Sequence, residues 1–250
     1  MITQIDGKTA ARLLGKETDV LSLKIGGNLK AYQGYDFCSF YAGKNIFIGR
    51  YYDDLVVRTK GGLSEEETEE LSLFLKVCGF KQAICGLETG RRLENMGWKN
   101  CFESIQFKFS SNLVPENEDY PALSELEENP PLDGVFEILK DGFPDLGYEQ
   151  WYTDISHKIR HGVSRVYVYG GATATVMSDM NGSVFIALLA SKKEARGTGT
   201  AKKLLRALGV GFEKQGKESS VLCREELIPF YRKAGFYECG KTITINNSLI

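Results

Sequence analysis

Arg196-Gly197-Thr198-Gly199-Thr200-Ala201 is the stretch of sequence that decides the fold. It follows an apolar, strand-like run over residues 184–190 and precedes a helix-like run over residues 202–212. Small residues at the start of a helix leave backbone N–H groups free to face an anion, and the helix dipole adds partial positive charge there. Glycine also lets the backbone approach a phosphate without an intervening Cβ. The stretch therefore predicts a cradle for a diphosphate, with Arg196 as a cation beside it.

Two common phosphate-binding signatures do not fit this stretch. The dinucleotide fingerprint G-x-G-x-x-G/A fails because its last position, counted from Gly197, is Lys202. The P-loop pattern, which ends in Gly-Lys followed by Ser or Thr, does not occur in the chain. The pattern that does fit is R-x-x-G-x-A, placed between a strand and a helix.

A second element lies downstream in the sequence Pro-Phe-Tyr-Arg-Lys-Ala-Gly-Phe at residues 229–236. It follows a strand-like run at 219–223, and Gly235 is a normal stop for the short helix expected over residues 225–234. Together, R-x-x-G-x-A and this F-Y-x-x-x-G-F run resemble the GNAT superfamily of acetyl-CoA-dependent N-acetyltransferases. The resemblance implies an α/β fold of the α+β type, with a mixed, mostly antiparallel sheet flanked by helices.

The resemblance also implies an activity. Members of the family transfer the acetyl group of acetyl-CoA, a cosubstrate, to a primary amine by direct attack in a ternary complex. Two alternatives stay open from the sequence. One is a non-catalytic sensor or regulatory module that binds coenzyme A, and the other is an acyltransferase that uses another acyl-CoA.

Site residues follow from the same resemblance. Tyr231, in the F-Y-x-x-x-G-F run, is expected to be the general acid that protonates the departing thiolate. Arg224 stands where the family commonly has an asparagine, and we expect it to reach a phosphate. The main chain at the end of the preceding strand is expected to hold the pantetheine arm. The cofactor-binding residues predicted beside Arg224 are Leu189, Ala190, Ser191, Arg196, Gly197, Thr198, Gly199, Thr200, Ala201 and Lys202.

The general base is left open by the sequence. Glu225 and Glu226 are candidates, as are His157 and His161 on an early helix, and a chain of water molecules would serve equally.

The acceptor is not specified either. In the family the first helices contact it, and here they carry Tyr148, Trp151, Tyr152 and Asp154. Aromatic rings with a carboxylate suit an amine, but the simpler interpretation, which we favour, is a helix whose aromatic face packs inward.

Composition narrows the class of protein. The chain has 250 residues and a net charge of −2, which suits two domains and excludes a basic surface for nucleic acid. No apolar run is long enough for a membrane span, and the N-terminus does not resemble a secretory signal. Six cysteines without a C-x-x-C pair, and two histidines, predict no metal site. We expect a cytoplasmic protein, monomer or homodimer, that acts on a small-molecule or peptide amine without nucleic-acid or membrane partners.

The chain divides at a linker over residues 112–131, which is rich in proline and acidic residues. Residues 132–250 form the predicted catalytic domain. Residues 1–111 show the same late order of strand, helix, strand, short helix, Gly-aromatic and strand, which predicts a degenerate GNAT-like or accessory domain. Its cradle, at residues 61–67, lacks the arginine and carries Glu65, Glu66 and Glu67, so we predict that it does not bind coenzyme A.

Overall fold

The computed structural model describes residues 1–247, and the chain forms two compact units. Of the described residues, the first unit comprises Met1–Gln106 together with residues 240–247, and the second comprises Phe107–Cys239. Strands β6 (Cys101–Phe109) and β12 (Phe236–Asn246) are therefore each divided between the units. The division of function predicted from the sequence, with a linker at 112–131, stays a prediction. In the compact units, the last residues of the chain belong with the N-terminal residues.

The first unit contains, besides parts of β6 and β12, the elements β1 (Thr3–Ile5), α1 (Gly7–Leu14), α2 (Val20–Tyr32), β2 (Cys38–Ala42), β3 (Ile46–Tyr51), β4 (Asp54–Thr59), α3 (Glu65–Cys78), β5 (Gln82–Gly86) and α4 (Leu87–Asn95). The second contains the 3-10 turns η1 (Ser111–Leu113), η2 (Leu123–Glu125), η3 (Lys193–Ala195) and η4 (Glu225–Leu227), with β7 (Glu127–Glu128), α5 (Leu132–Gly142), α6 (Tyr148–Arg160), β8 (Arg165–Tyr169), β9 (Ala172–Met180), β10 (Ser183–Ser191), α7 (Thr200–Lys214), β11 (Glu218–Cys223) and α8 (Ile228–Lys233).

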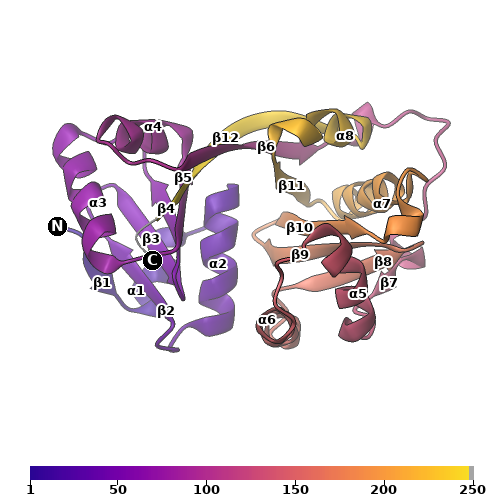
Figure 1. The fold of residues 1–250 in the computed structure, drawn as a ribbon, viewed down its shortest axis with the longest axis horizontal. Coiled ribbons are helices and arrows are strands. Elements are labelled where there is room, and N and C mark those ends of the chain that lie inside the picture. The colour runs from indigo at the N-terminus through magenta and orange to yellow at the C-terminus, as the bar shows by residue number, and fades with distance from the viewer. Residues whose placement is uncertain (248–250) are drawn as a thin grey trace. The chain divides into compact units, whose positions relative to one another are not determined.

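The element order is repeated (Figure 1). The series β1-α1-α2-β2-β3-β4-α3-β5-α4-β6 returns as β7-α5-α6-β8-β9-β10-α7-β11-α8-β12. In each copy the first four strands pair antiparallel, and a helix then crosses over to a parallel neighbour: β4 to β5 through α3, and β10 to β11 through α7. The expectation of two tandem domains with mixed, mostly antiparallel sheets and flanking helices is confirmed. The sequence reading missed α1 and α2, which complete the repeat.

The core of the first unit includes the end of the chain. Thr242–Asn246 of β12 pairs antiparallel with Gln82–Gly86 of β5. Ile243 and Ile245 are fully buried there, in one cluster with Leu71 and Leu75 of α3. On the other face, Ile25 of α2 packs against β3, where a Cβ at position 49 would come within 3.1 Å of it. The sheet of this unit is thus covered by helices on both faces.

The second unit has the same layers. Helices α5 and α6 cover one face of the β8-β9-β10 sheet through a cluster that contains Val135, Ile138, Trp151 and Ala190. On α7, Leu204, Leu205 and Leu208 are buried. This packing fixes β10 and the start of α7, the two elements on which the candidate site is built.

Candidate functional site

Strand β10 is irregular just before the cradle. Ala187 pairs with Thr175 of β9 and Ala190 pairs with Thr173. Between these two pairs, β10 contains one more residue than β9. The extra residue forms a β-bulge, and Leu188 inside it has a φ of 49°, a left-handed conformation that is uncommon for a non-glycine residue. The bulge re-aims the backbone of the residues that follow it.

Beyond the bulge, β10 leaves its parallel neighbour. The register with β11 covers Ser183–Ile186 against Glu218–Val221, although β10 continues to Ser191 and β11 to Cys223. Leu189, Ala190 and Ser191 therefore lie past the last recorded pair with β11, at the point where the two strands diverge. The recorded pairs of Ala190 and Ser191 are with β9, on the other side, and the ligand-holding role of these three residues stays a prediction.

The cradle loop needs glycine at two positions. Gly197 has a φ of 77° and Gly199, the N-cap of α7, a φ of 82°, which only glycine adopts without strain. A Cβ at either position would meet nothing within 4 Å, so the space beside the loop is open. The first internal bond of α7 runs from the Lys203 N–H to the Gly199 carbonyl at 3.0 Å, and the N–H groups before it have no acceptor inside the helix.

Side chains of the cradle loop stabilise it through hydrogen bonds. The Thr198 hydroxyl lies 2.7 Å from the Ala195 carbonyl and 2.6 Å from the Thr200 hydroxyl. The Arg196 guanidinium donates to the backbone carbonyl of Asp141, at the C-terminal end of α5. Because the carbonyl end of a helix carries partial negative charge, this contact holds the guanidinium beside the cradle.

Two supports of the cradle were not foreseen from the sequence. The Asp141 carboxylate accepts from the Lys193 N–H at 3.0 Å and so fixes the turn that leads into the loop. The β8–β9 turn packs on the cradle as well, because a Cβ at Gly170 would lie 2.8 Å from the Thr200 methyl. The sequence signal was present in Gly170-Gly171, but it indicated a hairpin and not its neighbour.

Basic side chains of α7 are paired with the acidic segment before η2. Lys202 lies 2.9 Å from a carboxylate oxygen of Glu118, and the buried Arg206 forms an ion pair with the same carboxylate. Lys203 lies 3.0 Å from Asp119. Lys202, a predicted cradle residue, is thus at the start of α7 as expected, but its ammonium already has an anionic partner.

Tyr231 lies inside the second unit, on α8. Its side chain is buried, with its ring 5.7 Å from that of Phe107 and 5.9 Å from that of Phe236. Burial raises the pKa of the phenol, and the nearby Cys223 raises it further. The phenol is therefore held in its protonated form, and Cys223, which affects it, is the last residue of β11.

The other candidates on this side are exposed. Arg224, predicted to reach a phosphate, is at the N-cap of η4 and lies 3.9 Å from the Glu226 carboxylate. Its side chain is 78% exposed. Glu225 and Glu226 are exposed in the turn that follows.

The two histidines lie at the other end of the sheet. Tyr169 at the end of β8 and Ser191 at the end of β10 both pair with Ala172, which puts these strand ends next to the cradle. His157 and His161 precede the start of β8, and their rings stack with centroids 4.0 Å apart. The structure does not bring them together with the cradle.

Helix α6 shows which aromatic residues are available to an acceptor. Trp151 is buried in the core, as the inward-packing interpretation predicts. Tyr148 and Tyr152 are 39% and 40% exposed, and their rings lie 5.5 Å apart. The Tyr148 hydroxyl donates to Asp133, which raises the pKa of that phenol to about 12. Asp154 is engaged with the buried Lys158 at 3.0 Å.

The corresponding loop of the first unit is closed by its own side chains. Ser64 and Glu67 form a capping box, with the Ser64 N–H donating to Glu67 at 2.9 Å and the Glu67 N–H to the Ser64 hydroxyl at 3.2 Å. A Cβ at Gly62 would lie 2.9 Å from a carboxylate oxygen of Glu88. Two N–H groups at the start of α3 are thus occupied, and the Glu88 carboxylate lies beside Gly62.

Comparison with known proteins identifies the second half of the chain. Residues 141–249 match the family model described as an acetyltransferase (GNAT) domain. They are a GNAT domain. The family resemblance of R-x-x-G-x-A and F-Y-x-x-x-G-F is thereby confirmed. No curated protein matches the sequence significantly.

Solved structures extend the GNAT likeness to the fold of the whole chain. A tandem GNAT protein from the clavulanic acid biosynthesis pathway is similar with a TM-score of 0.61 and 10% identity, covering 98% of both chains. A GNAT-family acetyltransferase from Colwellia psychrerythraea is similar with a TM-score of 0.60 and 12% identity, and the match covers 98% of this chain and 99% of that one. A GCN5-related N-acetyltransferase from Sphaerobacter thermophilus is similar with a TM-score of 0.61 and 15% identity, and the match covers 99% of this chain and 95% of that one.

Two features are absent from residues 1–247. No helix in that range has the length and apolar character to cross a membrane. No group of three or more His, Cys, Asp or Glu side chains there is placed to hold a metal ion.

Proposed function

We propose that this GNAT protein transfers the acetyl group of acetyl-CoA to a primary amine by direct attack in a ternary complex. The observation that carries the proposal is the divergence of β10 from β11 next to the cradle. There, unpaired strand backbone, two open glycines and the start of α7 meet at one end of the sheet. An acyl donor with a diphosphate and a peptide-like arm suits this combination of groups.

The donor would be held mainly by backbone. We assign the diphosphate to the N–H groups of residues 197–202, beside the open space at Gly197 and Gly199, where it gains from the positive end of α7. Arg196, anchored on the end of α5, adds a full positive charge. Leu189, Ala190 and Ser191 offer main-chain donors and acceptors to the amide-containing arm, in the manner of an added strand.

The chemistry needs a polarised thioester and two proton transfers. Acetyl-CoA supplies the activated acetyl group. The left-handed turn at Leu188 exposes backbone on the diverging edge of β10, and an N–H group there can stabilise the oxyanion as the amine attacks. Tyr231 stays protonated in its buried position and donates its proton to the thiolate as it leaves. The amine must arrive neutral, and the base that takes its proton is Glu225, Glu226 or water; the histidines lie at the wrong end of the sheet.

The acceptor is proposed to be a small molecule or a peptide with a primary amine. Exposed rings of Tyr148 and Tyr152, beside the Asp133 carboxylate, support recognition of a cation on α6. The first unit is proposed not to bind coenzyme A, because its capping box and Glu88 take the place of an anion. All six cysteines are free thiols, which supports a reducing compartment, the cytoplasm, for a monomer or homodimer.

Calorimetric titration with acetyl-CoA tests the donor site. We expect micromolar binding that is lost in Gly199→Glu, because the new carboxylate would face the phosphates. Gly216→Glu is the matched control. Gly216 ends the same helix with a φ of 73° and open space around its Cβ, so it suffers the same backbone strain away from the cradle. Loss in both variants would indicate misfolding, and binding retained in Gly199→Glu would contradict the cradle.

Turnover separates the enzyme from the alternatives. Release of the free thiol of coenzyme A, followed with a panel of primary amines, is expected only when donor and amine are both present. Acetyl-CoA binding without turnover across the panel would favour a sensor. Faster thiol release with longer acyl donors would favour an acyltransferase of different chain length.

A further inference from the structure

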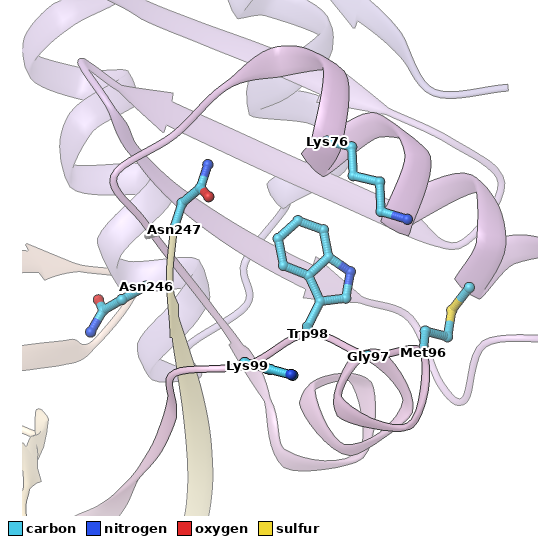
Figure 2. Close-up of a pocket in the computed structure, with 7 residues that line it drawn as sticks. All are labelled: Lys76, Met96, Gly97, Trp98, Lys99, Asn246 and Asn247. Atoms are coloured by element: carbon cyan, nitrogen blue, oxygen red, sulfur yellow. The ribbon is translucent and has the colours of Figure 1, made fainter. Parts of the chain in front are cut away.

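A pocket in the first unit contains no residue of either cradle loop. It is lined by residues of α3, of the turn after α4 and of the end of β12, and its volume is about 330 Å³. Figure 2 shows the indole ring of Trp98 between Lys76, on α3, and Lys99, its neighbour in the chain. The remaining lining residues are Met96, Gly97, Asn246 and Asn247.

The indole that forms the wall is held in place before any ligand arrives. Its Nε1 donates to the hydroxyl of the buried Ser72 at 2.9 Å, and its ring lies 5.7 Å from that of Phe80. Gly97 turns the chain with a φ of 93°, which sets the ring against the core on one side. A flat apolar surface fixed in this way costs little entropy to bind.

The charge of the described lining has one sign. Among residues 1–247, Lys76 and Lys99 line the pocket, and none of the lining residues in that range is acidic. Across residues 1–247, neither ammonium is recorded in an ion pair or hydrogen bond, while many lysines elsewhere in that range are paired. Two cations at one concave site attract an anion.

We propose that this pocket binds a small aromatic anion, with its ring on Trp98 and its acidic group toward the ammonium groups of Lys76 and Lys99. The ring and the charge are both needed, because the indole provides stacking area while the two lysines provide positive charge. A volume of about 330 Å³ is at the small end of ligand pockets and suits one ring with a carboxylate or phosphate. The inference is independent of acetyl transfer.

Phenyl phosphate is the probe for the test. The chain has two tryptophans, and Trp151 is buried in the second unit, so the Trp151→Phe variant leaves Trp98 as the sole indole reporter. We expect saturable quenching of its fluorescence by phenyl phosphate and by benzoate. Benzyl alcohol, which has the ring without charge, and inorganic phosphate, which has the charge without a ring, are each expected to bind at least about tenfold more weakly.

Lysine variants in the same background complete the test. Lys76→Ala and Lys99→Ala are each expected to weaken phenyl phosphate binding by about threefold or more, and the double variant by about tenfold. Lys60→Ala, an exposed lysine of the same unit outside the lining, is the control and should change nothing. The proposal is overturned if the double variant binds as tightly as its parent, if benzyl alcohol or inorganic phosphate matches phenyl phosphate, or if no probe saturates.

Discussion

The carboxylate of Glu118 bridges the start of α7, lying 2.9 Å from the ammonium of Lys202 while it also pairs with the guanidinium of Arg206. Arg206 is only 2% exposed, whereas Glu118 comes from the acidic segment that sequence alone assigned to a linker. One acidic residue thus serves a buried cation and, at the same time, a cation of the proposed donor site.

Glu118→Gln is expected to lower the free energy of unfolding by about 1–3 kcal/mol, because it leaves the buried Arg206 without a counter-charge. The figure lies below that of a fully buried pair since the Glu118 side chain is 37% exposed. Urea unfolding measures it. The Asp119→Asn variant, whose parent side chain is 93% exposed, should stay within about 0.5 kcal/mol of the wild type. Equal losses in both would mean that Arg206 does not depend on Glu118.

The same substitution is expected to tighten acetyl-CoA binding. Removing the carboxylate frees the Lys202 ammonium for the diphosphate, and one exposed charge pair corresponds to about a two- to fivefold gain in affinity at low salt. Titration calorimetry at two salt concentrations measures the gain in affinity for acetyl-CoA and how far salt reduces that gain. Weaker binding in Glu118→Gln would show that the Glu118–Lys202 pair organises the cradle and does not compete with the ligand.

Gly170→Ala is expected to weaken acetyl-CoA binding by about threefold or more. The new methyl group would come within 2.8 Å of Thr200 and push the first residue of α7. Gly162→Ala is the matched control, because Gly162 has a φ of 62° with open space around it, so both variants carry the same strain of about 1 kcal/mol. Equal affinities in the two variants would mean that the β8–β9 turn does not position the cradle.

Tyr231→Phe is expected to lower kcat by about ten- to a hundredfold with little change in the Kd for acetyl-CoA, as for the loss of a general acid. Because burial raises the pKa of Tyr231, no fall in kcat below pH 10 should depend on its ionisation. Tyr237→Phe removes an exposed phenol nearby and serves as the control. An unchanged kcat in Tyr231→Phe would leave this tyrosine with a packing role alone.

The first unit should lose stability in alkaline solution through Cys85. Burial raises the pKa of this thiol to about 12, so the folded state keeps its proton where the unfolded state has lost it. From about pH 9 upward, the unfolded state therefore binds fewer protons than the folded state. The free energy of unfolding then falls with rising pH, by up to about 1.4 kcal/mol per pH unit. Denaturant titrations from pH 8 to 10.5 should show a shallower fall in Cys85→Ala; parallel curves would contradict the assignment.

The sequence could predict features that depend on residues close together in the chain. The glycines at 197 and 199 and the Ser64–Glu67 capping box act within one turn of chain, so local pattern sufficed to place the two helix starts. The divergence at the end of β10 followed from the family resemblance.

The contacts between distant segments could not be predicted in this way. The pairing of Glu118 with Arg206 and the packing of Gly170 on Thr200 depend on which segments meet after folding. No spacing in the sequence encodes them. The left-handed Leu188 was missed for a related reason: an apolar run predicts a regular strand, and only the register against β9 shows the extra residue.

The place of β12 has a consequence for how the molecule is made. Ile243 and Ile245 are core residues of the unit that contains the N-terminus, and their strand completes its sheet beside β5. During synthesis, the ribosome delivers these residues after every other strand of residues 1–247. The first unit to be translated is therefore the last that can close its core, and until then β5 presents an unpaired edge that invites aggregation.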